Sequence, residues 1–343
     1  GGLSRPHRGC GVTQPVRRPS ARVVIVNWRQ AELTIRAASS IREQLGDRDG
    51  LVIVDNASGD GSAERLRREG LTVVESSENR GFGAGVNLGA LGMEEEVLVL
   101  LNNDAVAEPG FLEALLAALS DPPSAVAPAA ATARILLAGR WTPAAPGQPD
   151  ALVSPRTGRW TRLDDQAAAR GEGEVLVNST GNLVDASGNG YDRDWLVPAD
   201  REHSPSEVFG LCGGACAIRR EAWQALGGFR EDLFMYYEDT DLSWRLRERG
   251  WRVLYVREAV ARHDHASSSG TDSPMFIRVN ARNRILTAAA HSPAPVVMQA
   301  LARTLVRTVR GPQRGPVMTG LAQAVLGLPR ELRRRARGSS SSQ

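Results

Sequence analysis

The sequence predicts an α/β protein built on a doubly wound, mostly parallel sheet, and three observations support this. Short apolar runs without polar alternation recur through residues 21–120, as in strands that are buried on both faces. Helix-like stretches separate these runs, which is the spacing of βαβ units. Each run ends in a polar residue, and sheets of this kind bind ligands at the carboxyl ends of their strands.

The first part of the chain is expected to alternate strands with helices. The predicted strands are 22–28, 50–55, 71–75 and 97–102, and their last polar residues are Asn27, Asp55, Glu75 and Asn102. The predicted helices are 31–45, 60–69 and 83–93. Residues 121–210 are rich in Pro, Gly and Asp, so short strands and loops are expected there as a substrate-facing insertion.

The second part returns to longer regular elements. Helices are predicted at 221–228 and 236–249, and Gly250 is a suitable residue to end the second. A strand at 251–256 and helices at 274–290 and 296–309 follow. An Arg-rich segment interrupted by proline and an irregular SSSSQ tail complete the chain. We therefore expect a helical C-terminal extension.

Composition and charge exclude several classes of function. All 42 basic residues are Arg, so Schiff-base and P-loop mechanisms that need a lysine are excluded. Acidic residues outnumber Arg between residues 21 and 290, so this part is not expected to bind nucleic acid. The three cysteines form no even disulfide framework, and residues 1–20 lack the apolar run of a signal peptide. We therefore expect a cytoplasmic protein.

Two polar segments that follow predicted strands are candidates for a ligand site. The first is DNAS at 55–58, for which a turn with a helix cap is the simpler interpretation. The second is NND at 102–104, where Asp104 either caps the next helix or shares a divalent cation with a nucleotide diphosphate. The segment NRGFGAG at 79–85 is Gly-rich, but its spacing matches neither a P-loop nor a dinucleotide fingerprint.

The segment YYEDTD at 236–241 places three acids in the first turn of a helix, where the helix dipole favours negative charge. Asp241 lies four residues before Arg245, which gives it an ordinary surface partner. Asp239 faces Ser243 instead, so helix stability explains it least. A carboxylate kept free of a cationic partner is suited to act as a base.

His263 and His265 follow the strand predicted at 251–256. Their spacing places both side chains at the carboxyl edge of that strand. Either histidine could complete a metal site, and a purely structural role is the alternative.

Seven segments occur together and in the order found in family 2 glycosyltransferases, inverting enzymes with the GT-A fold, which the chain resembles over residues 22–290. The segments are VVIVNW (23–28), VDNASGDGS (54–62), ENRGFGAGVNLG (78–89), LLNNDA (100–105), GGACAIRREAWQALGGF (213–229), MYYEDTDLSWRLRERGW (235–251) and RHDHASSSG (262–270). The chain is most similar to bacterial enzymes that transfer rhamnose or a related sugar to a lipid-linked or cell-envelope glycan.

The resemblance implies a role for each matching residue. The residues expected at the nucleotide are Asn27, Asp55, Asn56, Asn79, Gly81 and Asn103. Asp104 would be the metal-binding acid of a DXD-like motif, which here reads NND, and His263 and His265 are further candidate ligands for Mg²⁺ or Mn²⁺. Asp239 would be the catalytic base, with Glu238 beside it.

Two other positions bear on the resemblance. Arg230 stands where the family commonly has Asp, which leaves the role of that loop open. Arg282 and Asn283 match a common RN pair, for which a contact with the diphosphate is implied.

The implied reaction is inverting transfer of a sugar from a nucleoside-diphosphate sugar, dTDP-rhamnose or a UDP-sugar, to a hydroxyl of a glycan or lipid-linked acceptor. The expected organisation is a flexible basic arm (1–20), a nucleotide-sugar-binding half (21–120), an acceptor-binding and catalytic half (121–290) and a basic helical extension with a disordered tail (291–343). Two alternatives stay open: a nucleotidyltransferase that makes a sugar nucleotide, and a non-catalytic module that binds one. The first usually has a Gly-rich loop where this chain has NWRQ (27–30).

The C-terminal extension has the pattern of an amphipathic surface helix. An apolar stripe at helical spacing consists of Val297, Leu301, Leu305 and Val309. Arg residues lie between these positions and again at 333–337. This pattern predicts peripheral contact with the anionic inner face of the cell membrane. Packing of the stripe on the domain is the alternative.

Overall fold

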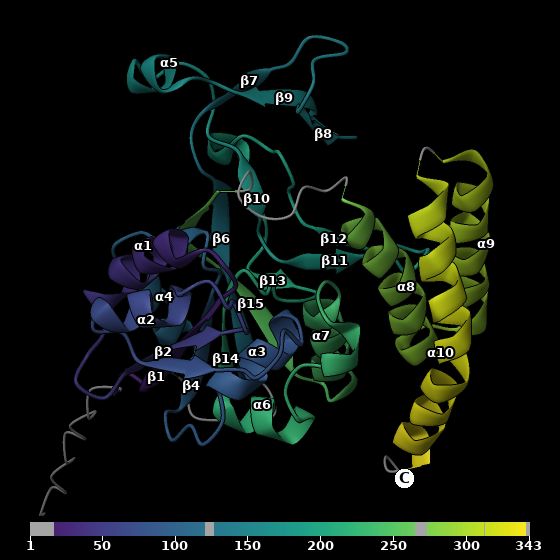
Figure 1. Ribbon diagram of the computed structural model, residues 1–343, viewed down its shortest axis with the longest axis horizontal. Coiled ribbons are helices and arrows are strands. Elements are labelled where there is room, and N and C mark those ends of the chain that lie inside the picture. Colours follow the sequence, from purple (N-terminus) through teal and green to yellow (C-terminus); the bar gives the residue numbers. More distant parts are fainter. Residues whose placement is uncertain (1–16, 121–126, 265–272, 312, 341–343) are drawn as a thin grey trace, which may run out of the picture.

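A computed structural model of the chain describes residues 17–120, 127–264, 273–311 and 313–340 (Figure 1). A ten-stranded mixed sheet carries helices on both faces, and a C-terminal helical bundle flanks it. The predicted α/β class, with a mostly parallel central sheet and a helical extension, is confirmed.

The first four strands form the parallel part of the sheet in the order β3-β2-β1-β4. They are β1 (Ala21–Asn27), β2 (Gly50–Asp55), β3 (Val73–Glu75) and β4 (Val97–Leu101), and the helices between them are α1 (Ala31–Arg42), α2 (Ser62–Arg68) and α3 (Phe82–Gly89). In this register Asn27 pairs with Asp55, and Asp55 pairs with Glu75. The polar strand ends therefore meet at one edge, as the sequence predicts.

The remaining strands of the sheet come from the second part of the chain. They are β5 (Ala105–Ala107), β6 (Pro128–Leu137), β10 (Val177–Ser179), β13 (Glu207–Val208), β14 (Ala215–Arg219) and β15 (Arg252–His263). Strand β14 lies between β4 and β6 and is antiparallel to both. Strand β15 continues beyond the predicted 251–256 because a register shift between Val256 and Val260 lets it stay paired with β6.

Successive residues of β1 point to opposite faces of the sheet and build two cores. Val23 and Ile25 pack with α1, α2 and α4 (Phe111–Ala118) on one face. Val24 packs on the other face with α3, α6 (Arg220–Leu226) and α7 (Glu238–Glu248). Both faces of the sheet are therefore buried, which explains why its strands lack polar alternation.

Most elements between residues 127 and 210 are short, as the composition predicts, but the ten-residue strand β6 of the main sheet also lies there. The short elements outside the main sheet form the insertion. They are β7 (Trp141–Pro143), β8 (Leu152–Ser154), β9 (Gly158–Arg162), α5 (Asp165–Ala169), β11 (Asn182–Val184), β12 (Gly190–Asp192) and the short 3-10 helix η1 (Ala199–Arg201). A second 3-10 helix, η2 (Glu231–Leu233), lies beyond the insertion, before α7. Strands β7, β9 and β8 form a small sheet that stands away from the main sheet in Figure 1. Trp141 and Trp160 anchor its core.

The C-terminal extension consists of α8 (Pro274–His291), α9 (Ala294–Arg310) and α10 (Arg314–Ser340). The prediction that proline interrupts the last segment is wrong, because α10 runs through Pro329 to Ser340. Residues 341–343 of the predicted irregular tail lie outside the described residues. Ala324, Leu321 and Leu328 of this helix pack against the core of the bundle. Burial of that face outweighs the backbone hydrogen bond that a proline removes.

The basic arm is described only from residue 17 onwards, and this part is attached to the domain. Arg18 forms an ion pair with Asp49, with 2.8 Å between Nη1 and Oδ2. The backbone N–H of Ser20 donates to Glu96 at 2.9 Å.

Candidate active site

The ends of β1 and β2 form a buried hydrogen-bonded cluster. Asn27 Nδ2 donates to Asp55 Oδ2 at 2.7 Å, and the same oxygen accepts the Ser58 hydroxyl at 2.7 Å. Asp55 Oδ1 accepts the backbone N–H of Ser58 at 2.9 Å. Asp55 thus organises the turn after β2 but does not cap α2, whose N-cap is Gly61. The structure brings Asn27 and Asp55 together, and a contact with a nucleotide stays a prediction.

Asn56 joins this turn to the loop before α3. Its Nδ2 donates to Asn79 Oδ1 at 3.1 Å and to the carbonyl of Gly81 at 3.0 Å. Its buried Oδ1 has no hydrogen-bond partner in the described part of the chain. Asn103 lies on the other side of β1, where its Nδ2 donates to Gln30 Oε1 at 3.2 Å.

The glycines at 81–89 are explained by close packing. Gly81 has φ 88° and ψ 179°, and a Cβ there would lie 1.8 Å from the carbonyl oxygen of Phe234. Gly85 and Gly89 leave room for Val26 and Val24 beneath α3. This helix therefore lies close to β1 and to the loop before α7.

Asp104 and His263 face each other at the same edge of the sheet. Antiparallel pairing of β5 with β15 sets His263 opposite Ala105, and Asp104 Oδ1 lies 2.9 Å from His263 Nε2. His263 Nδ1 contacts Asn178 Oδ1 at 2.8 Å, and this partner directs Nε2 towards the carboxylate. Asp104 does not cap α4, whose N-cap is Gly110.

These two residues fit a divalent cation as a pair of neighbouring ligands. Both side chains are largely buried, and Asp104 Oδ1 and His263 Nε2 pair directly with each other. Burial lowers the pKa of His263, but the charge of Asp104 outweighs it and the net shift is upward. Within the described residues no third His, Cys, Asp or Glu joins them, so donor phosphates and water would complete the coordination. His265 lies outside the described residues.

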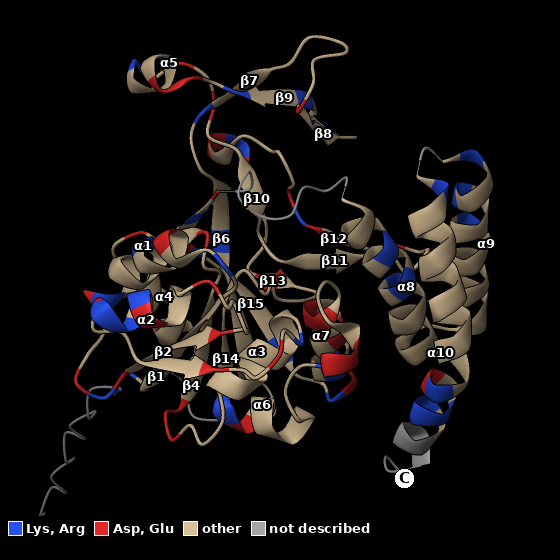
Figure 2. Cartoon of the chain, viewed as in Figure 1, with Lys and Arg blue, Asp and Glu red and all other residues tan. Residues whose placement is uncertain are grey.

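Asp239 lies half-buried in the first turn of α7, a helix on which several acidic residues gather (Figure 2). Its Oδ2 accepts the backbone N–H of Gly213 at 3.1 Å, and its Oδ1 accepts that of Thr240 at 2.6 Å. Within the described part of the chain no Arg or His pairs with it, as the sequence predicts. Burial raises the pKa of Asp239, and the two N–H donors reduce this shift without cancelling it.

Glu238 is buried beside Asp239. Burial, together with the charge of Asp239, raises the pKa of Glu238 to about 8. The side chain is therefore an uncharged acid at neutral pH, and its Oε2 has no hydrogen-bond partner among the described residues.

Asp192 at the end of β12 is a further carboxylate at this site, and no motif in the sequence points to it. Burial and then the charge of Asp239 raise the pKa of Asp192 to about 6, against an opposing hydrogen bond from Ser179. Its only sequence signal is the acidic segment YDRD at 191–194 within a region of loops. The fold, and not a motif, brings it to Asp239.

The predicted pairing of Asp241 with Arg245 is confirmed, but its expected place on the surface is wrong. Asp241 is 1% exposed and contacts Arg245 Nε at 2.7 Å, His291 Nε2 at 2.9 Å and Arg230 Nη1 at 3.3 Å. These partners hold the pKa of the Asp241 carboxyl well below its usual range, despite the opposing effect of burial. The second and third partners come from other elements, which the spacing within α7 does not reveal.

Arg282 and Asn283 hold the loop that precedes α7. Asn283 Nδ2 donates to the carbonyls of Leu233, Met235 and Tyr236 at 2.7–3.0 Å. Arg282 Nη2 donates to two carbonyls of the same loop. Arg282 and Asn283 therefore position residues 233–236 of this loop. The contact with the diphosphate that the family resemblance implies for them stays a prediction.

Family models match most of the described domain. The model "Glycosyl transferase family 2" matches residues 22–162, and "Glycosyl transferase family group 2" matches residues 171–292. The chain is 28% identical over 235 residues to the N-acetylglucosaminyl-diphospho-decaprenol L-rhamnosyltransferase of two Mycobacterium tuberculosis strains. That match spans 65% of this chain and 68% of the relative.

Solved structures share the fold at low identity. Mannosyltransferase PcManGT from Pyrobaculum calidifontis, in complex with GDP-Man and Mn²⁺, has a TM-score of 0.50 and 19% identity, covering 93% of this chain and 85% of its own. GalNAc-T7 with UDP, GalNAc and Mn²⁺ also has a TM-score of 0.50, with 16% identity, covering 82% of this chain and 53% of its own.

Proposed function

Because this chain is a family 2 glycosyltransferase, we propose that it transfers a sugar from a nucleoside-diphosphate sugar to a hydroxyl of a lipid-linked acceptor, with inversion. The curated relative favours dTDP-rhamnose as donor and a diphospholipid-linked N-acetylglucosamine as acceptor. Both matched models describe glycosyltransferases, which favours this class over the nucleotidyltransferase and the binding module.

The observation that carries the mechanism is the environment of Asp239. In the proposed reaction the acceptor hydroxyl gives its proton to a carboxylate oxygen of Asp239 while its oxygen attacks the anomeric carbon, and the bond from that carbon to the donor diphosphate breaks. The raised pKa makes Asp239 a stronger base than an exposed aspartate. The N–H groups of Gly213 and Thr240 hold its carboxylate in place.

Asp104 and His263 are the residues that would hold Mg²⁺ or Mn²⁺, whose charge would stabilise the departing diphosphate. Two of the similar structures contain Mn²⁺. We assign residues 21–120 to the donor nucleotide, through Asn27, Asp55, Asn56, Asn79, Gly81 and Asn103. Residues 121–290 would supply the acceptor site.

The test compares Asp239→Asn with Asp192→Asn. Asp239→Asn is expected to retain donor binding and to lose about 10²- to 10⁴-fold in kcat, as for removal of a general base. Asp192→Asn keeps Asp239 and is the matched control, with a smaller loss. Transfer by Asp239→Asn at the parent rate would show that another group is the base.

We also propose peripheral contact with an anionic membrane. No helix in the described ranges is long and apolar enough to cross a membrane. Val297 and Leu301 of the predicted stripe pack on the bundle, whereas Leu305 and Val309 are exposed. On α10, Met318, Val325 and Leu332 are exposed at seven-residue spacing and lie along one side of the helix.

Sedimentation with vesicles tests this contact. The parent should sediment with anionic vesicles and less so with added salt, and Val325→Glu should weaken binding. Point variants are preferable to truncation, because α10 carries the buried Glu331. Equal sedimentation with neutral vesicles, or none with either kind, would remove the membrane contact and leave the transferase proposal intact.

A further inference from the structure

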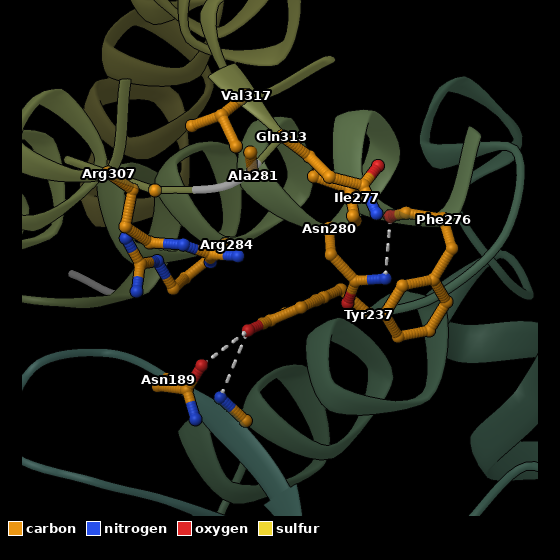
Figure 3. A pocket seen from close by; sticks show the side chains of 12 residues that line it. Asn189, Tyr237, Phe276, Ile277, Asn280, Ala281, Arg284, Arg307, Gln313 and Val317 are labelled. Carbon is orange, nitrogen blue, oxygen red and sulfur yellow. Dashed lines mark hydrogen bonds between the residues drawn. The ribbon is translucent and has the colours of Figure 1, made fainter. Parts of the chain in front are cut away.

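A cavity of about 360 Å³ lies where α8 and α9 meet the β11–β12 hairpin, within the size range of ligand pockets. Figure 3 shows Arg284 and Arg307 converging on it from the bundle, with the Tyr237 hydroxyl opposite them. The Tyr237 oxygen accepts the N–H of Gly190 at 3.3 Å and lies 3.3 Å from Asn189 Oδ1. Polar groups from three parts of the chain therefore share one cavity.

Among the residues that the structure describes, no carboxylate forms an ion pair with the cation Arg284. It is 8% exposed, and its Nη2 donates only to neutral groups, the carbonyl of Ala300 and the Thr304 hydroxyl. Its Nε has no hydrogen-bond partner among the described residues. A buried charge in this condition is costly unless a ligand supplies the missing acceptors.

The surroundings of Arg284 add positive charge. Arg307 lines the same cavity, and in the described part of the chain it pairs with no carboxylate. Burial lowers the pKa of Arg284, Tyr237 opposes this shift, and repulsion by Arg307 and Arg303 adds to it. Asp185 is a nearby acid that raises the pKa of Arg284, but its effect is the weakest of these. Its carboxylate also accepts a hydrogen bond from the Ser187 hydroxyl. The cavity therefore favours an anion.

Two residues that line the cavity are close in sequence to the carboxylates of the candidate active site. Tyr237 lies two residues before Asp239, and Gly190 lies two residues before Asp192 on β12, a span of about 7 Å in a strand. Phe276, Ile277 and Val317 supply an apolar wall to the same cavity. A ligand with an anionic group against the arginines and an apolar tail along this wall could thus place an attached sugar near Asp239.

We propose that this cavity binds the diphosphate of a lipid-linked acceptor, with Arg284 and Arg307 as its ligands. This inference rests on the proposed function and assigns the acceptor side of the same site. Arg284 and Arg307 are binding residues, and the chemical step remains with Asp239. Two guanidinium groups suit a diphosphate because each can form two parallel hydrogen bonds with phosphate oxygens.

Calorimetric titration with geranyl diphosphate, inorganic pyrophosphate and geraniol tests the assignment, with the donor site saturated by nucleoside diphosphate and Mg²⁺. The parent should bind geranyl diphosphate more tightly than pyrophosphate and should not bind geraniol. Arg307→Gln should raise the Kd for geranyl diphosphate about tenfold or more, because a charge-assisted hydrogen bond is lost. Arg310→Gln is the matched control, because Arg310 is an exposed cation of the same helix that does not line the cavity. The Kd of this variant for geranyl diphosphate should equal that of the parent.

Arg284→Lys keeps the charge but not the planar fork, and it should also weaken binding while the protein keeps its melting temperature within a few degrees. The subsite would be overturned if Arg307→Gln left the Kd for geranyl diphosphate unchanged. It would also be overturned if Arg310→Gln weakened binding as much as Arg307→Gln. Pyrophosphate bound as tightly as geranyl diphosphate would assign the cavity to free phosphate and overturn the lipid assignment.

Binding is measured without sugar transfer, so the two proposals can fail separately. A parent that transfers sugar but binds geranyl diphosphate independently of Arg307 refutes only the subsite. A parent that transfers no sugar to any acceptor refutes the proposed function. With a short prenyl-diphosphate N-acetylglucosamine, Arg307→Gln should raise the acceptor KM about tenfold and leave the donor KM unchanged.

Discussion

The guanidinium of Arg230 donates to both carboxylate oxygens of Glu331, at 3.1 Å to Oε2 and 2.7 Å to Oε1, across 101 residues of sequence. Both side chains are buried, and Arg230 Nη1 also lies 3.3 Å from Asp241 Oδ1. The last helix is thereby tied to α7, the helix whose first turn contains the candidate base Asp239. The Arg that departs from the family pattern has a structural explanation in this chain.

Replacing Arg230 with Met should strongly destabilise the protein, because it leaves Asp241 and Glu331 buried without this cation. We expect a loss of about 3–5 kcal/mol in the free energy of unfolding, measured by urea denaturation. Arg252→Met removes a half-exposed ion pair with Glu207 and should cost no more than about 1 kcal/mol. Similar losses in the two variants would show that the buried network contributes little.

His291 should make stability depend on pH. Its two ring nitrogens contact Asp241 and Glu248, and although burial lowers the pKa of His291, these carboxylates raise it above the ordinary 6.5. The stabilisation is complete below the unfolded pKa and is lost as pH rises through the folded value. His291→Gln should therefore show a smaller fall in unfolding free energy above about pH 6.5 than the parent. Parallel pH profiles for the two proteins would contradict this.

Glu238 should contribute a second pH dependence of the same sign. Its folded pKa of about 8 exceeds the ordinary 4.5, so the folded state retains a proton that the unfolded state releases. Parent stability should then decline as pH rises from 4.5 to about 8, and Glu238→Gln should flatten this decline. Chemical denaturation across this range measures it, and an equal slope in the variant would refute the buried uncharged acid.

Gly81→Ala should destabilise the protein and lower kcat. Its φ of 88° with ψ 179° is confined to glycine, and the added Cβ would overlap the carbonyl of Phe234. Displacement of that loop should disturb the start of α7. Gly110→Ala, at φ 86° with open space around the Cβ, is the control and should lose only the backbone term of about 1–2 kcal/mol. Equal behaviour of both variants would exclude the contact with Phe234 as a cause.

Asp104→Asn should weaken binding of a nucleoside diphosphate only when Mg²⁺ or Mn²⁺ is present. The reason is that a neutral amide is a poorer ligand for a hard cation than a carboxylate. Calorimetry with and without EDTA measures the effect, and EDTA should lower the affinity of the parent to that of the variant. A parent affinity that is the same in EDTA would indicate binding without metal.

The site could be predicted from sequence where its parts lie at the ends of consecutive parallel strands. Asn27 and Asp55 fall in this class, because strand polarity alone brings their positions together. The contact of Asp104 with His263 depends on a register shift within β15, for which the sequence has no clear signal. Asp192 and Arg284 reach the site from a hairpin and a helix bundle, so only the tertiary fold reveals them.

Strand β14 lies between β4 and β6 in the sheet but is synthesised after both. The sheet therefore cannot be completed until this later strand has been translated. When residues 128–137 have left the ribosome, the three strands that will pair with them, β10, β14 and β15, have not yet been made. The wholly apolar β4 then has an open hydrogen-bonding edge for the time needed to synthesise more than a hundred residues, from 101 to 215. Such an edge is a template for pairing with another nascent chain. Slow elongation through the insertion would prolong this exposure, so a holdase chaperone is expected to improve the yield of native protein.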